Sequence, residues 1–179
     1  MVLKRVCKAT VVTFIVATTY ILAFNKPADS SSQIRVIYEH VDASTLDQAH
    51  CLATNLYFEA GHQARREQEA IAHVVLNRVE DKSFPNTICG VVYQAETYES
   101  GFPIRHRCQF SWYCDGLKEI ITDEDAWQKA YNTAFMITQI KRPELTQGSL
   151  YYHSIRASPE WRKEKEYVIT VGRHIFYRE

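Results

Sequence analysis

The chain has 179 residues, 46% apolar and 12% aromatic, with only 6 Gly and 5 Pro, which excludes a disordered, collagen-like or low-complexity protein. Its 21 Lys and Arg balance its 21 Asp and Glu, so no basic excess indicates a nucleic-acid-binding protein. A chain of this length can bury a substantial core within one domain.

The first 25 residues predict a targeting segment. Lys4, Arg5 and Lys8 precede an uncharged run over residues 9–24. A positive start followed by an apolar stretch is typical of a cleaved signal peptide or of a signal anchor. As a helix the run spans about 24 Å against a bilayer core of about 30 Å, so both interpretations stay open. We expect export to the periplasm or cell envelope, free or tethered to the inner membrane by residues 9–24.

Residues 26–43 are polar and predict a linker, so the folded domain is expected over residues 44–179. Four cysteines lie in that domain: Cys51, Cys89, Cys108 and Cys114. An even count in an exported protein favours disulfides, and the sequence leaves three pairings open. Zinc binding is the competing interpretation, but the spacing has no paired C-x-x-C units, and we expect neither a metal nor a cofactor.

Helical spacing of apolar residues dominates the first half of the domain. It predicts a helix from Ser44 to Ala60 that ends at Gly61, a second helix over 63–79 and a short third one around 88–92. Residues 95–116 combine Gly, Pro, His and aromatic residues without any periodicity. This segment is expected to be a long loop, and loops of such length are usually functional.

The second half predicts one more long helix and then strands. Asp123 is expected to open a helix that Pro143 stops, and 158–161 resembles a helix start with Pro at its first position. The β-prone segments 167–171 and 174–177 flank a Gly172-Arg173 turn, and 150–152 is a candidate third strand. The sequence therefore predicts a mainly α, α+β fold with a small C-terminal β-hairpin sheet.

Glu59 is the candidate catalytic residue. On a helical wheel it falls at the edge of the apolar stripe, beside Leu52, and it lies in the last turn of the first helix. Partial burial and the helix dipole both raise the pKa of a carboxyl at such a position. A general acid needs a raised pKa to hold its proton near neutral pH. The alternative is an ordinary boundary glutamate.

The ordered motifs of residues 46–178 resemble the catalytic domain of SleB/CwlJ-type cell wall hydrolases, which include spore-cortex-lytic enzymes. The matching segments are Tyr57-Phe58-Glu59-Ala60, Gln68, 70–79, 84–89, 91–94, 108–116, Tyr152-His153, 158–161 and 171–178. The resemblance implies a lysozyme-like, lytic-transglycosylase-like helical scaffold that cleaves the glycan strand of peptidoglycan. It also implies that Glu59 is the catalytic acid.

The chain departs from the family pattern directly after Glu59. The family usually continues with Ala-Arg-Gly-Glu, whereas this chain reads Ala60-Gly61-His62-Gln63, and an amide cannot transfer a proton. A lytic transglycosylase needs only one carboxyl group, unlike ordinary glycoside hydrolysis with two. The departure therefore favours the transglycosylase mechanism. Glu67 and Glu69 are alternative partners, although they begin a charged helix face.

Aromatic and polar residues in the motifs are candidates for binding the sugar. Aromatic faces stack on pyranose rings, and amides or carboxylates bond to hydroxyl and N-acetyl groups. The candidate substrate-binding residues are Gln109, Ser111, Trp112, Tyr113, Asp115, Tyr152 and His153. Their alternative role is structural: the first five would fix a disulfide-bounded loop, and a lone histidine is more often structural.

Two other function classes stay open. A cysteine peptidase acting on the peptide stems would need a free, activated thiol and would be sensitive to iodoacetamide. A non-catalytic wall-binding or zinc module would bind sacculi and release no fragments. For the glycosidase we expect a monomer whose partner is peptidoglycan, with membrane contact only through an uncleaved N-terminus. A phage endolysin and a bacterial remodelling or germination enzyme both fit that activity.

Overall fold

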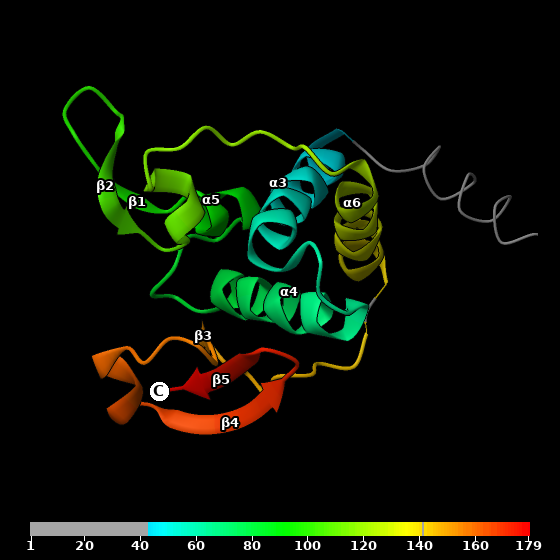
Figure 1. Ribbon diagram of the computed structural model, residues 1–179, viewed down its shortest axis with the longest axis vertical. Coiled ribbons are helices and arrows are strands. Elements are labelled where there is room, and N and C mark those ends of the chain that lie inside the picture. Colours follow the sequence, from blue (N-terminus) through cyan, green and yellow to red (C-terminus); the bar gives the residue numbers. More distant parts are fainter. Residues whose placement is uncertain (1–42, 141) are drawn as a thin grey trace, which may run out of the picture. The chain divides into compact units, whose positions relative to one another are not determined.

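The computed structural model of the protein describes residues 43–140 and 142–179 (Figure 1). The predicted targeting segment and linker lie outside these residues, apart from Ala43. Within the described ranges no helix combines the length and the apolar composition that crossing a membrane requires. The helical elements are α3 (Ala43–Ala60), α4 (Arg65–Glu80), α5 (Ile88–Val92) and α6 (Glu124–Gln139), with single 3₁₀ turns η1 (Ser111–Cys114) and η2 (Glu160–Lys163).

Helix α3 confirms the predicted first helix and packs along α6 (Figure 1). Its stripe side chains Leu52 and Leu56 are fully buried, and each such side chain contributes about 1.5–3 kcal/mol. The helix ends at Ala60, as predicted, and the Gly61 amide makes its last hydrogen bond, to the Tyr57 carbonyl oxygen at 3.0 Å. A Cβ at Gly61 would lie 2.6 Å from that oxygen, so only glycine permits this close approach.

The other predicted helices are also confirmed. Helix α4 lies between the helices above it and the C-terminal sheet below it (Figure 1), and residues 70–75 are buried without a break. Six consecutive buried residues are expected where a helix is covered on all sides. Helix α6 begins after Asp123, whose Oδ1 accepts from the Ala126 amide at 2.9 Å, an N-cap of the predicted kind.

The prediction of a loop over residues 95–116 is wrong. Strands β1 (Ala95–Thr97) and β2 (Pro103–Cys108) form a hairpin, followed directly by η1. The hairpin is largely exposed on both faces, with Phe102 at 72% exposure, so its strands carry no alternation between apolar and polar residues. Without a buried face, periodicity gives no signal for a strand.

The small C-terminal sheet is confirmed. Strands β3 (Tyr151–Ser154), β4 (Glu166–Val171) and β5 (His174–Arg178) form an antiparallel sheet in the order β3-β5-β4. Gly172 makes the predicted turn with a φ of +57°. At 158–161 the structure differs: Pro159 precedes η2, a single 3₁₀ turn instead of a full helix.

The carboxylate of Glu67 joins α4 to this sheet. Glu67 is 3% exposed, and its Oε1 accepts from the Arg173 amide at 2.9 Å and from Nδ1 of His174 at 2.7 Å. This buried contact holds the β4–β5 turn against the first turn of α4. The sheet that carries Tyr152 is thereby fixed to the helix that carries Arg78.

Candidate active site

Glu59 is the penultimate residue of α3 and is partly buried. Burial raises the pKa of its carboxyl above the ordinary value, which is the direction that the helical wheel predicts. The Tyr152 hydroxyl and the positive charge of Arg78 lower that pKa, but by less than burial raises it. The carboxyl therefore holds a proton to a higher pH than a surface glutamate does.

Arg78 supplies a buried positive charge beside Glu59. It projects from α4, is 5% exposed, and its Nε donates to the Leu150 carbonyl oxygen at 2.8 Å. Its guanidinium carbon lies 5.1 Å from the ring centroid of Phe84 and 5.4 Å from that of Phe110. Burial lowers the pKa of Arg78, and Nη1 is buried without a hydrogen-bond partner.

Tyr152 reaches Glu59 from β3. Its hydroxyl oxygen is buried and makes no hydrogen bond of standard geometry, although the hydroxyl interacts with both Glu59 and Asn55. Burial, followed by the nearby Glu59 charge, raises the pKa of Tyr152 well above its ordinary range. The hydroxyl therefore keeps its proton and acts as a donor.

Asn55 completes the surroundings of Glu59. It lies on α3 one turn before Glu59 and is fully buried. Its Oδ1 accepts from the indole Nε1 of Trp112 at 3.0 Å, and its Nδ2 has no partner. Glu59 and Asn55 lie on α3, Arg78 on α4 and Tyr152 on β3, and η1 contacts this group of residues through Trp112.

The candidate sugar-binding residues within 109–115 divide into a buried and an exposed set. Trp112 is 8% exposed and stacks on Phe58 with the ring centroids 4.9 Å apart. Tyr113 is partly buried and meets the ring of Tyr93 edge-on at 5.0 Å. Gln109 and Ser111 are exposed.

Two further loop positions are defined by local contacts. Gln109 lines a cavity of about 330 Å³ with Gln94, Glu96 and Arg107. Asp115 caps a turn, because its Oδ1 accepts from the Leu117 amide at 2.7 Å.

His153 lies on a different side of β3 from Tyr152. Successive strand residues point to opposite faces, and His153 stacks on Tyr177 at 5.3 Å and meets Trp161 at 5.7 Å. Its Nε2 lies 3.1 Å from the Tyr177 hydroxyl. The structure places it in this aromatic cluster and does not bring it together with Glu59.

The other carboxylates considered as partners for Glu59 are engaged elsewhere. Glu67 binds the β4–β5 turn, and Glu69 accepts from Arg65 at 3.1 Å and from Arg142 at 3.0 Å. The groups that lower the pKa of Glu59 are instead the Tyr152 hydroxyl and the Arg78 charge.

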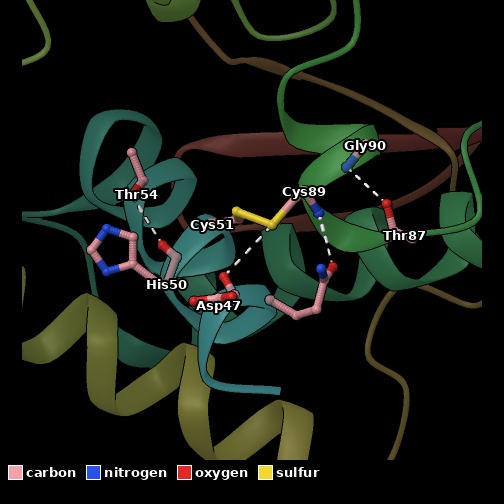
Figure 2. The surroundings of a disulfide bond; sticks show 8 residues. Asp47, His50, Cys51, Thr54, Thr87, Cys89 and Gly90 are labelled. Carbon is pink, nitrogen blue, oxygen red and sulfur yellow. Dashed lines mark hydrogen bonds between the residues drawn. A yellow bond between two sulfur atoms is a disulfide. The ribbon is translucent and has the colours of Figure 1, made fainter. Parts of the chain in front are cut away.

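Two disulfides link elements around the site. Cys51 of α3 is bonded to Cys89 of α5, and Cys108 of β2 is bonded to Cys114 of η1, which confirms the expectation of disulfides. Figure 2 shows the first bond, with Cys89 Sγ 3.6 Å from the Asp47 carbonyl oxygen. This is a contact and not a hydrogen bond, because a disulfide sulfur carries no proton. The second bond closes the segment that carries Trp112.

No group of three His, Cys, Asp or Glu side chains able to hold a metal ion occurs among residues 43–140 and 142–179. With both cysteine pairs oxidised, these residues also contain no free thiol of the kind a cysteine peptidase requires.

Asn55 and Arg78 are the site residues that sequence reasoning missed. Asn55 precedes Glu59 by four residues on α3, a spacing that places both on one helix face and could have drawn attention to it. Arg78 lies within the 70–79 motif, where its neighbour Asn77 has a structural contact: Nδ2 of Asn77 donates to the Ser149 carbonyl oxygen at 3.0 Å.

Known proteins resemble this chain over most of its length. A spore cortex-lytic enzyme of Bacillus cereus is 29% identical over 126 residues, which are 70% of this chain and 42% of the relative. The chain thus spans less than half the length of that relative.

Among solved structures, the catalytic domain of the germination-specific lytic transglycosylase SleB from Bacillus anthracis matches with a TM-score of 0.53 and 24% identity, over 78% of this chain and 98% of that one. The catalytic domain of the Bacillus cereus SleB protein matches with a TM-score of 0.52 and 25% identity, over 73% and 89% of the two chains. These matches confirm the expected lysozyme-like, mainly helical fold. The model of the cell wall hydrolase family matches residues 62–177, and the chain therefore belongs to the cell wall hydrolase family.

Proposed function

We propose that the domain cleaves the glycan strand of peptidoglycan and that Glu59 is its proton donor. The observation that carries the proposal is the raised pKa of the partly buried Glu59 carboxyl, at a site where Arg78 and Tyr152 face it. Glu59 lies just before the segment that matches the family model, so its role rests on this geometry and on the sequence motif.

The surroundings of Glu59 favour lytic transglycosylation. Glu59 gives its proton to the glycosidic oxygen, the bond from that oxygen to the anomeric carbon breaks, and the leaving sugar departs with a hydroxyl group. The Glu59 carboxylate then takes the proton of the muramic 6-hydroxyl, whose oxygen bonds to the anomeric carbon. One carboxyl group serves both transfers, which suits a site where Glu67 and Glu69 are bonded elsewhere. The similar Bacillus anthracis domain is described as a lytic transglycosylase.

Sugar binding is assigned to the segment between β2 and the end of η1. The exposed Gln109 and Ser111 can reach hydroxyl and N-acetyl groups, and Tyr113 offers a ring edge and a hydroxyl. We also propose that Asp115 and His153 contact the sugar. Trp112 is buried, so its contribution to sugar binding would be indirect, through the shape of the loop.

The proposed site of action is outside the cytoplasm. Two disulfides suit an oxidising compartment, and the positive and then apolar N-terminus predicts export. A reporter enzyme that is active only in the cytoplasm, fused after Glu179, should be silent. Strong reporter activity would contradict export. A holin gene beside this one would identify a phage endolysin, and its absence would favour wall remodelling or germination.

Digestion of purified sacculi tests the activity. Wild-type protein should release muropeptides with 1,6-anhydro-muramic ends, seen by mass spectrometry, and Glu59→Gln should lose roughly 10²–10⁴-fold in rate. Glu124→Gln is the matched control, because Glu124 is exposed in the first turn of α6. Reducing muramic ends would show that water is the nucleophile. Wild-type rates in Glu59→Gln would remove Glu59 from the mechanism.

A further inference from the structure

Unpartnered polar atoms gather around Glu59. In the part of the chain that the structure describes, five buried side-chain polar atoms have no hydrogen-bond partner, and three of them belong to Asn55, Arg78 and Tyr152. Buried polar groups in proteins are nearly always hydrogen-bonded, so such a cluster calls for a functional explanation. All three atoms are donors: Nδ2 of Asn55, Nη1 of Arg78 and the hydroxyl of Tyr152.

Trp112 fixes which end of the Asn55 amide faces the site. An indole N–H can only donate, and Nε1 of Trp112 lies 3.0 Å from the amide of Asn55, with both side chains buried. The amide oxygen must therefore take the indole proton. The NH₂ group is left facing away from the indole, and it can only donate as well.

The Tyr152 hydroxyl links Asn55 to Glu59, since it interacts with both of them. When its oxygen accepts from the Asn55 NH₂ group, its own proton remains for Glu59. A carboxylate only accepts hydrogen bonds, so the direction from Trp112 through Asn55 and Tyr152 to Glu59 suits the ionised form of Glu59. In the structure, the contacts from Asn55 to Tyr152 and from Tyr152 to Glu59 do not have hydrogen-bond geometry. Catalytic hydrogen bonds are often long without substrate and tighten when it binds.

We infer that Asn55 and Tyr152 are positioning residues of a one-way hydrogen-bond chain, oriented by Trp112, that stabilises the Glu59 carboxylate between its two proton transfers. This inference rests on the proposed function. After Glu59 has given its proton to the glycosidic oxygen, a charge remains on a carboxyl that burial disfavours. The Tyr152 hydroxyl and the Arg78 charge stabilise it until the sugar hydroxyl returns a proton, so no proton is gained or lost over the cycle.

The chain also favours one position for the proton of neutral Glu59. The carboxyl oxygen that accepts from Tyr152 is the less suitable one to carry a hydrogen atom. The proton is then placed on the other oxygen, where it is available to the substrate. A plain buried carboxyl without such a donor would have no preference between its two oxygens.

Tyr152→Phe removes the last donor and keeps the ring. The ionisation of Glu59 is followed by carbon-13 NMR of glutamate-labelled protein, with the resonance assigned by Glu59→Gln, alongside the pH profile of sacculus digestion. Loss of a donor to the carboxylate should move both the Glu59 titration and the alkaline limb of the activity profile to higher pH. The rate at the optimum should fall roughly 10- to 100-fold, the range for one hydrogen bond to a charged group.

Trp112→Phe tests the direction of the hydrogen-bond chain, because without the indole N–H the Asn55 amide can rotate and exchange its oxygen and nitrogen positions. It should move the Glu59 titration the same way by a smaller amount, whereas Tyr167→Phe, an exposed tyrosine of β4, should leave both curves unchanged. An unmoved or downward-shifted titration in Tyr152→Phe or Trp112→Phe would overturn the inference, even with Glu59→Gln inactive. Because the NMR titration needs no turnover, it reports on the chain separately from the proposed activity.

Discussion

Gly172 faces the carboxylate of Glu67 so closely that a Cβ on it would lie 1.9 Å from Oε2. The turn between β4 and β5 is therefore shaped around the side chain of a helix more than 100 residues earlier in the chain. Glu67 also accepts from the backbone amide of Arg173 and from the ring of His174, so the fit combines close packing with hydrogen bonding.

Substitution at this contact should be strongly non-additive. Gly172→Ala should destabilise the domain, because the new Cβ collides with Glu67 and the φ of +57° disfavours a side chain. Glu67→Ala should cost about 1–3 kcal/mol for each of the two donors that it leaves unsatisfied. In the double variant the collision is gone and only the φ cost is added, so its loss should be smaller than the sum of the single losses.

Urea unfolding of wild type, the two single variants and the double variant measures this non-additivity. Arg66→Ala is a suitable control, since Arg66 is exposed in the same first turn of α4. Additive losses would show that Glu67 and Gly172 are not in contact in solution.

Glu59→Gln should raise stability while it removes activity. The pKa of Glu59 is raised in the folded state, so folding favours its neutral form. Wild-type protein therefore loses stability as the pH rises from the unfolded-state pKa through the higher folded-state pKa, and glutamine, which resembles the neutral carboxyl, does not.

Thermal unfolding at about pH 4 and about pH 8 measures this effect. The variant should melt above wild type at the higher pH, and the two melting temperatures should converge at the lower one. A variant that melts below wild type at pH 8 would mean that Glu59 is stabilising as an anion.

Gln68 should matter for the position of Glu59. It is fully buried, its Nε2 donates to the carbonyl oxygen of Ala60 at 3.0 Å, and its Oε1 lies 3.0 Å from Oγ1 of Thr133. Gln68→Leu removes this hydrogen bond, a loss of about 0.5–1.5 kcal/mol, and leaves the Ala60 carbonyl oxygen with the Gln63 amide, at 3.0 Å, as its remaining donor. We expect a lower digestion rate than in Gln128→Leu, an exposed change on α6. Equal rates in the two variants would show that the end of α3 holds its shape without Gln68.

The two disulfides should differ in their contributions. Cys51–Cys89 closes a loop with a sequence separation of 38, and Cys108–Cys114 one of 6. Loop-closure entropy gives about 4 kcal/mol for the first and about 2 kcal/mol for the second. Paired Cys→Ser variants, unfolded in urea under non-reducing conditions, should follow that order.

The smaller loop carries Trp112, so Cys108→Ser/Cys114→Ser should impair activity more than its stability loss suggests. Unchanged activity would separate that disulfide from the site. Free thiols at all four of these cysteines, in wild-type protein made in an oxidising compartment, would contradict both pairings.

Periodicity and turn chemistry predict most of the fold, because α3, α4, α6 and β3 to β5 each bury a face that leaves a pattern in the sequence. The β1–β2 hairpin buries little and leaves none. At the site, Glu59 is detectable because a carboxylate at the edge of an apolar stripe conflicts with its surroundings. Asn55 gives a weaker signal: its spacing places it on the same helix face as Glu59, but its role becomes visible only when Trp112, 57 residues later, is seen to bind it. Strand alternation separates Tyr152 from His153, and a motif alone does not say which of them faces inward.

The order β3-β5-β4 also has a temporal consequence. A ribosome or an export channel delivers Glu59 long before it delivers β5, the middle strand, without which β3 and β4 have no neighbour to pair with. Until β5 is present, Tyr152 has no sheet to hold it beside Glu59. A nascent or truncated chain that lacks β5 is therefore expected to lack the arrangement of Tyr152 beside Glu59.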